Sequence, residues 1–250
     1  MTWSWLDIAF PWIGGAAALV LLLLLFGSRL LQSDPNLPRW HDLVWLSWLA
    51  DAVYLLHNVE EYGVDLLGHT HAFPNSLCAT LKLPPYPACP IPPPFFLAVN
   101  LSLFWVVGPV AALLSRRHPL AGLSLYSVIS INMLVHVASI VTSGHIYNPG
   151  LFTALVLFLP LSIWIARASF GRGLLPYSAL GLLLIWGVFM HLILAASAKL
   201  VTRGLIGSTA AEATQIVNAG LLLFVTWLGE RWLVTTPRRI DSSSLSSASR

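Results

Sequence analysis

Residues 8–28 read IAFPWIGGAAALVLLLLLFGS, and this stretch decides the fold class. It contains no charged residue, and it is long enough to cross the hydrocarbon core of a bilayer, which takes about 20 apolar residues in a helix. No Lys or Arg precedes it, and Arg29 follows it. We therefore expect a membrane helix that is retained, because a cleaved signal peptide begins with basic residues.

The rest of the chain has the same character. Of its 250 residues, 57% are hydrophobic and only 9% are charged, against roughly a quarter in soluble domains. This composition excludes a soluble globular enzyme, a disordered chain and a disulfide-dense secreted protein. The net charge of +3 is scattered between apolar runs, so we expect no nucleic-acid partner. The sequence predicts an all-α, polytopic transmembrane helical bundle over residues 1–234, with the lipid bilayer as its first partner.

About seven spans follow from the apolar runs. No internal repeat relates them, although many secondary transporters are built from such repeats. The sequence leaves open which membrane holds the bundle and whether the chain forms oligomers. The predicted spans are residues 8–28, 43–67, 94–114, 119–143, 151–166, 174–199 and 206–228.

The basic residues predict the orientation, because cytoplasmic loops of membrane proteins are enriched in Lys and Arg. With seven spans, Lys82, Lys199 and Arg203 fall on one side and all other basic residues on the other. This asymmetry places the N-terminus outside and the C-terminus in the cytoplasm. The Ser-rich, basic segment 235–250 is then a disordered cytoplasmic tail. The basic residues of the predicted inner side are Arg29, Arg39, Arg116, Arg117, Arg167, Arg172, Arg231, Arg238, Arg239 and Arg250.

The longest connection, residues 68–93, lies on the predicted outer side. Its prolines between residues 84 and 93 exclude a helix over that part. It also holds Cys78 and Cys89, the only cysteines of the chain. An oxidising outer compartment favours a disulfide between them, but two unpaired loop thiols are equally compatible with the sequence.

The second predicted span carries an unusual number of ionisable residues. At about 100° per residue, His57 and Glu61 lie about 40° apart on a helix, and Glu60 lies on the other flank of His57. Ionisable side chains inside a membrane usually face the protein interior and mark functional sites. One face of this span therefore presents an imidazole between two carboxylates. The ionisable residues of the span are Asp51, His57, Glu60, Glu61 and Asp65.

Polar residues in other spans predict partners for this face. His136 and His191 lie in spans that run in the same direction as the second span. Counted from the span ends, they differ in height from His57 and Glu61 by about 6 Å or less. We therefore expect one polar layer in the outer half of the membrane. Its neighbours, expected to contact substrate or to hydrogen-bond the layer, are Tyr54, Asn132 and Asn218, the last on a span with Glu212 and Gln215.

The segment LHNVEEY at residues 56–62 resembles the signature of the HXXEE-domain family. These small integral-membrane proteins are named for that motif and are largely uncharacterised. The segments NMLVH at 132–136 and YNPG at 147–150 are similar to two further family elements, and Thr153 and Pro160 follow in order. The resemblance covers about residues 45–200. It implies an enzyme, but it supplies no established reaction.

The favoured chemistry is that of a metal-dependent enzyme acting on a lipophilic substrate. His57, Glu61 and His136 provide the two imidazoles and one carboxylate found in many zinc and non-haem iron sites, with His191 or Glu60 as a fourth group. Bound zinc lowers the pKa of a coordinated water to near neutrality. Glu60 is then a candidate general base, and the sequence leaves open which of Glu60 and Glu61 is the ligand.

Two alternatives stay open. The first is a metal-free acid/base isomerase or cyclase of an isoprenoid- or lipid-like substrate, in which His57, Glu60 and Glu61 transfer protons. Aromatic side chains from among the eleven tryptophans would stabilise a carbocation there. The second is a proton- or metal-coupled transporter, because transporters also place His and Glu within the membrane.

Overall fold

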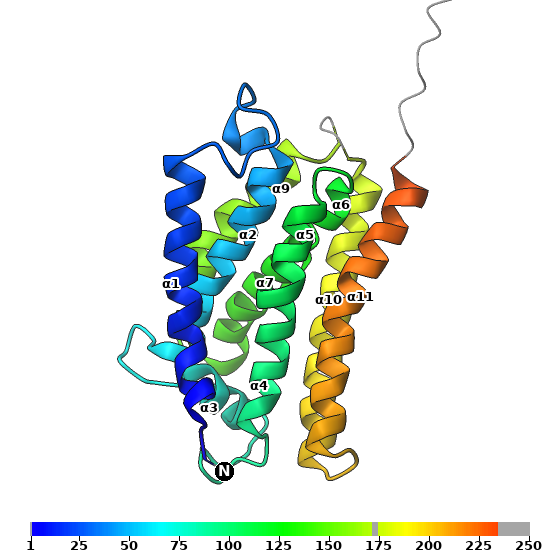
Figure 1. The fold of residues 1–250 in the computed structure, drawn as a ribbon. Coiled ribbons are helices and arrows are strands. Elements are labelled where there is room, and N and C mark those ends of the chain that lie inside the picture. Colours follow the sequence, from blue (N-terminus) through cyan, green and yellow to red (C-terminus); the bar gives the residue numbers. More distant parts are fainter. Residues whose placement is uncertain (1, 172–174, 235–250) are drawn as a thin grey trace, which may run out of the picture.

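The computed structural model describes residues 2–171 and 175–234, and every regular element within these ranges is helical (Figure 1). The predicted fold class, an all-α helical bundle, is confirmed. The predicted tail at 235–250 lies outside the described residues.

Within residues 2–171 and 175–234, seven long helical rods build the bundle, and several of them consist of two or three consecutive helices. Two shorter helices, η1 (Arg39–His41) and α3 (Ala72–Thr80), lie in connections. The rods are α1 (Trp5–Gly27), α2 (Leu43–Asn58) with η2 (Val59–Gly63), α4 (Pro93–Asn100) with η3 (Leu101–Val107) and α5 (Gly108–Leu114), α6 (Pro119–Gly122) with α7 (Leu125–Ser143), α8 (Leu151–Thr153) with η4 (Ala154–Phe158) and α9 (Leu159–Ala168), α10 (Tyr177–Thr202), and α11 (Ser208–Leu233).

Six of these rods in the described chain are long and apolar enough to cross a membrane, judged by length and composition. This is consistent with a multi-pass membrane protein. The exception is the α2–η2 rod, because Asp51, Glu60 and Glu61 make it more polar than the others. The rod also ends at Gly63, four residues before the predicted end of the span, and Leu67 is exposed in the loop that follows.

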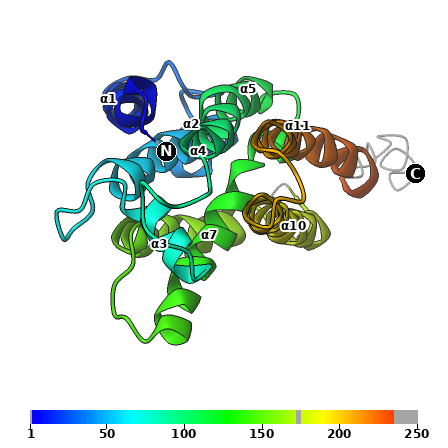
Figure 2. The same ribbon diagram turned by 90° about the horizontal axis from the view of Figure 1, so that it is seen from below.

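The α2–η2 rod is the interior helix of the bundle. Nearly all side chains of α2 are buried, and the helix packs against α1, α5 and α7 (Figure 2). The close approach to α1 is made by Gly15, where an added Cβ would lie 2.8 Å from the side chain of Val59. A helix surrounded by protein can hold charged groups that a lipid-facing helix could not. The position of α2 thus accounts for its polarity.

The basic residues separate between the two ends of the bundle. Lys82, Lys199 and Arg203 lie at the lower end in Figure 1, where α1 begins. The described arginines of the predicted inner set lie at the upper end, where α11 ends. This separation is what the positive-inside rule requires. Which end faces the cytoplasm stays a prediction.

The connection between η2 and α4 covers the lower end of the bundle. Residues 84–92 are not helical, as the prolines predict, but residues 72–80 form α3, a helix that the sequence pattern does not predict. The structure joins Cys78 of α3 to Cys89 in a disulfide. The ring of Phe73 in α3 packs against the ring of Tyr62 in η2, with ring centroids 5.6 Å apart. The connection therefore contacts the end of η2.

Candidate metal centre

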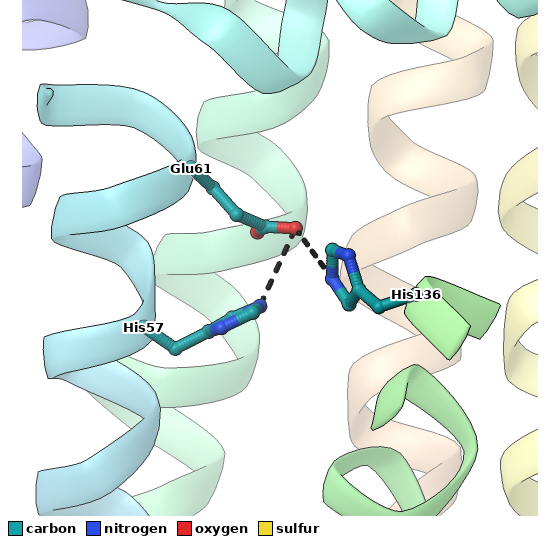
Figure 3. A group of neighbouring side chains, drawn as sticks. All are labelled: His57, Glu61 and His136. Atoms are coloured by element: carbon teal, nitrogen blue, oxygen red, sulfur yellow. Dashed lines mark ion pairs between the residues drawn. The ribbon is translucent and has the colours of Figure 1, made fainter. Parts of the chain in front are cut away.

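Three side chains from two neighbouring rods converge inside the bundle (Figure 3). Glu61 Oε1 lies 3.4 Å from His57 Nε2 and 3.3 Å from His136 Nε2. His57 stands on the last turn of α2, Glu61 follows in η2, and His136 projects from α7. All three are buried, and their three ligand atoms lie within 4.8 Å of one another. We call these three residues the metal group, because this arrangement can hold a metal ion.

The hydrogen bonds of His57 fix which ring nitrogen carries its proton. Its Nδ1 lies 2.7 Å from Thr153 Oγ1, and Thr153 Oγ1 lies 2.6 Å from Glu60 Oε2. The carboxylate accepts the single hydroxyl proton of Thr153, so Nδ1–H of His57 donates to that hydroxyl. The lone pair of Nε2 is then directed at the metal group, as in metal-binding histidines whose other nitrogen is held by a polar neighbour.

His136 is fixed in the same tautomer by a different partner. Its Nδ1 lies 2.6 Å from Asn148 Oδ1, and Asn148 Nδ2 donates to the backbone carbonyl of His136 at 3.0 Å. The second bond sets the orientation of the amide, so Oδ1 accepts the proton of Nδ1. His136 therefore also presents the lone pair of Nε2 to Glu61.

Each residue of the metal group has one buried acceptor atom without a hydrogen-bond partner. These atoms are His57 Nε2, His136 Nε2 and Glu61 Oε1. Buried polar atoms are rarely left unpaired, and three lone pairs at close range repel one another unless a cation lies between them. Ligands about 2.0–2.1 Å from a tetrahedral metal are roughly 3.3–3.4 Å apart, since the edge of a tetrahedron is about 1.6 bond lengths. The two distances from Glu61 match this spacing.

Glu60, although adjacent to Glu61, has a different role. Its Oε2 accepts from the backbone and the hydroxyl of Thr153, at 2.8 and 2.6 Å. Its Oε1 accepts from Phe152 N at 3.1 Å and from Tyr147 Oη at 3.0 Å. Burial raises the pKa of Tyr147, and the Glu60 carboxylate adds to this effect, so the phenol keeps the proton that it donates. Both oxygens of Glu60 are thus occupied by donors that belong to other residues, and its role as a general base stays a prediction.

The backbone on both sides of the metal group is specialised. η2 is a π-helix that begins directly after Asn58, and π-helical segments are frequent at functional sites. Across from it, Gly150 has a φ of +93° and lies against both imidazoles. A Cβ at this position would come within 2.6 Å of His136 Cε1 and 2.8 Å of His57 Cε1. The turn before α8 therefore needs glycine for its conformation and for the space it leaves.

A cavity of about 620 Å³ adjoins the metal group. Glu61 and His136 contribute to its lining, as do Tyr54 and Asn132, and most of the remaining surface is apolar. Asn132 Nδ2 donates to Tyr54 Oη, and the Tyr54 ring stacks on Phe104. No tryptophan is found among the described residues that line the cavity, so the predicted tryptophan lining is not present there.

His191 and Asn218 line the same cavity on α10 and α11. The structure does not bring His191 into the metal group, and its Nδ1 donates instead to the carbonyl of Gly187 at 2.8 Å. Asn218 Nδ2 donates to the carbonyl of Met190 at 3.3 Å. Both residues line the cavity that adjoins the metal group, but neither belongs to that group.

Three residues that hold the site were not predicted to do so, namely Asn148, Gly150 and Thr153. The sequence offered one signal for them, since all three lie in or just after the YNPG element that resembles the family pattern. What the sequence did not show is that this element folds back onto α2 and η2. The positions of the two imidazoles depend on that contact.

Comparison with known proteins supports the resemblance for part of the chain. Residues 48–165 match the family described as "Protein of unknown function with HXXEE motif". No curated protein and no solved structure shows a significant match. The match includes the metal group, Glu60, Asn148 and Thr153, and it ends before α10, which is earlier than the expected limit near residue 200. Residues 48–165 of the chain are therefore similar to the HXXEE family.

Proposed function

We propose that this protein is an integral-membrane, metal-dependent enzyme that acts on a lipophilic substrate, with zinc or ferrous iron held by His57, Glu61 and His136. One observation carries the proposal: three buried acceptor atoms of the metal group converge without hydrogen-bond partners. Neither imidazole can supply a proton to them, because each donates its ring proton elsewhere, to Thr153 or to Asn148. Two histidines and one carboxylate are the ligand set of catalytic zinc sites and of non-haem iron sites with open positions.

The chain's own residues would prepare the site for chemistry. Thr153 and Asn148 hold the imidazoles in one tautomer, and Glu60 holds Thr153. The apolar walls of the adjoining cavity keep bulk water away and favour a lipophilic substrate. A bound divalent metal supplies Lewis acidity or, if it is iron, redox chemistry. Zinc would indicate a hydrolase and iron an oxidoreductase.

The second candidate is a metal-free acid/base isomerase or cyclase. The distances of 3.3 and 3.4 Å are also those of ion pairs, so a proton on either imidazole could take the place of the metal. The absence of tryptophan from the described cavity lining removes one argument for carbocation chemistry. The transporter alternative has no observation of its own in its favour.

Metal analysis of the purified protein tests the proposal. After incubation with Zn²⁺, or with Fe²⁺ under anaerobic conditions, we expect close to one ion per chain by mass spectrometry. His57→Ala, His136→Ala and Glu61→Gln should each lose most of this metal. His191→Leu is the matched control, because it removes a cavity histidine outside the metal group.

The same measurement can overturn the proposal. A wild-type protein that stays metal-free, or variants that bind as much metal as the wild type, would contradict it and favour acid/base chemistry. Equal loss in His191→Leu would place the metal elsewhere in the cavity.

A further inference from the structure

The wall of the cavity opposite the metal group carries two side-chain amides. Gln215 and Asn218 lie three residues apart on α11 and so share one face of the helix. Both are buried and both line the cavity. We call these two residues the amide pair.

The amide pair has hydrogen-bonding capacity that the protein does not use. Gln215 Nε2, a donor, and Asn218 Oδ1, an acceptor, have no hydrogen-bond partner. His191 lies nearby on α10, and because its Nδ1 donates to Gly187, its Nε2 is available as another acceptor. Unsatisfied buried groups cost roughly 1–3 kcal/mol each, so their presence beside a cavity points to a ligand that pairs with them.

The charges around the cavity restrict what that ligand can be. No Lys, Arg or Asp is found among the described residues of the lining, and its one carboxylate, Glu61, belongs to the metal group. An anionic or cationic head group at the amide pair would therefore have no oppositely charged side chain beside it among the described α11 residues of the lining, which is costly. A neutral hydroxyl or amide avoids this cost and can pair with both a donor and an acceptor.

The cavity also has an apolar opening towards the outside of the bundle. Its lining includes exposed side chains on two helices, among them Ala138 of α7 and Leu192 and Ala195 of α10. The helices touch further along, where a Cβ at Gly187 would lie 2.3 Å from the carbonyl oxygen of Ser127. α7 and α10 lie side by side in the view along the bundle (Figure 2). The opening between them is therefore on a surface that would face lipid.

From these four observations we infer that the cavity binds a neutral single-chain lipid with a hydroxyl or amide head group. The head group pairs with Gln215 and Asn218, and the hydrocarbon chain leaves between α7 and α10. A volume of about 620 Å³ accommodates the head group and the first part of the chain. The inference names the substrate class of the proposed enzyme and in that sense rests on the proposed function, but the binding itself does not require the metal.

Binding of two radiolabelled probes tests the inference. The probes are N-oleoylethanolamine, which has an amide and a hydroxyl, and oleate, which has the same chain and a carboxylate. We expect the wild type to bind the amide at least about 10-fold more tightly than oleate, since an unpaired buried charge costs more than one lost hydrogen bond. Gln215→Leu and Asn218→Leu should each weaken amide binding about 10-fold.

A variant on the same helix serves as the control. Thr214→Val removes a hydroxyl from an exposed position outside this cavity, and it should bind the amide like the wild type. The inference is overturned if oleate binds as tightly as the amide, or if Gln215→Leu and Asn218→Leu both behave like Thr214→Val.

The route between α7 and α10 has its own matched pair. Ala195 and Ala196 are both exposed, but only Ala195 lines the cavity. Ala195→Trp should reduce amide binding severalfold, whereas Ala196→Trp should leave it unchanged. Equal binding by these two variants would contradict the proposed route.

Metal content measured on the same preparations separates this inference from the proposed function. A metal-free protein that discriminates between the probes and loses amide binding in Gln215→Leu would contradict the enzyme proposal and support the lipid inference. A protein that holds its metal but binds both probes equally would support the metal site and contradict the lipid inference.

Discussion

The metal group and the amide pair lie on opposite walls of one cavity, and their surroundings differ. His57 and His136 are each held by a side chain that is itself hydrogen-bonded, through Thr153 and Asn148. Within the part of the chain that the structure describes, Gln215 and Asn218 have no such support, and the hydrogen bond found for them runs from Asn218 to the carbonyl of Met190. The side chains of the first wall are thus fixed by hydrogen bonds within the protein, whereas those of the second have hydrogen-bonding groups left for a ligand.

The comparison also separates what the family match covers from what it does not. The metal group lies within the matched residues 48–165, and the amide pair lies beyond them on α11. In the two proposals made above, the chemistry belongs to residues 48–165 and the recognition of the substrate to the helices that complete the cavity. The following predictions test whether metal binding depends on the first wall and lipid binding on the second.

The largest effect is expected from Gly150→Ala. The added Cβ would strain a backbone with φ of +93° and collide with both imidazoles. We expect loss of most bound metal and a clearly lower Tm. Gly144→Ala is the control, because Gly144 has a similar φ of +72° but nothing within 4 Å of the added Cβ. If both variants lose metal equally, backbone strain alone explains the result and the contact with the imidazoles does not matter.

The disulfide is expected to matter next. Replacing both Cys78 and Cys89 by Ala removes a cross-link between residues 11 apart, which contributes about 3 kcal/mol to the free energy of unfolding in the chain-entropy view. The measurement is the Tm in detergent, and reductant should lower the wild-type Tm similarly. Because α3 supplies cavity residues but no metal ligand, the double variant should weaken binding of N-oleoylethanolamine more than binding of metal. A double variant that loses more metal binding than amide binding would contradict the separation between the two walls.

A smaller effect is expected from Glu60→Gln, which keeps the shape of the side chain but replaces one acceptor oxygen by a donor. Thr153 then loses part of its anchor, and His57 is held less firmly. Loss of such supporting bonds typically costs 10–100-fold in metal affinity. Competition with a chelator measures this affinity. Asn218→Leu, on the other wall, should leave it unchanged, and equal effects of the two variants would contradict the division between the walls.

The smallest effect is expected at His71, which directly precedes α3 in the connection between η2 and α4. Burial lowers the pKa of His71 below its ordinary 6.5, although the nearby carboxylate of Asp7 opposes this effect. The unfolded chain therefore binds the proton more readily than the folded protein does. The contribution of the neutral His71 to stability is present above pH 6.5, and it is lost as the pH falls through the lower pKa of the folded protein.

We expect a decrease in Tm of about 2 °C or less between pH 7.5 and 5.5. His71→Asn is the appropriate variant, because Asn does not titrate and tolerates the φ of 53° found here. It should show a weaker pH dependence than the wild type. Identical pH dependence of the two proteins would exclude His71 as the group responsible.

Much of this architecture could be predicted from the sequence, because apolar runs determine helices in a bilayer almost by length alone. The first helix begins at Trp5, slightly before the predicted Ile8, because Ser4 and Asp7 form a capping box. The convergence of His57, Glu61 and His136 also followed from simple helix geometry. These features depend on local periodicity and depth.

The remaining features depend on contacts between distant segments. Glu60 and Glu61 are chemically identical, and only the return of the chain at Thr153 gives them separate roles. His191 has the depth of a ligand, but its lateral position is set by the packing of α10 against α7 at Gly187. Neither contact leaves a periodic trace in the sequence. Helix α3 was missed because the prolines that follow it dominate the composition of that loop.

The interior position of α2 has a consequence for how the protein is made. A charged residue at the centre of a single helix adds roughly 2.5–3.5 kcal/mol to the free energy of insertion into a membrane, and this rod carries Asp51, Glu60 and Glu61. It is therefore poorly suited to enter the bilayer alone. α1, the most hydrophobic rod in the described chain, precedes it and packs along it, and residues 28–42 connect the two. The two rods are best inserted together as a hairpin, so that the charged groups of α2 reach a protein environment without first contacting lipid.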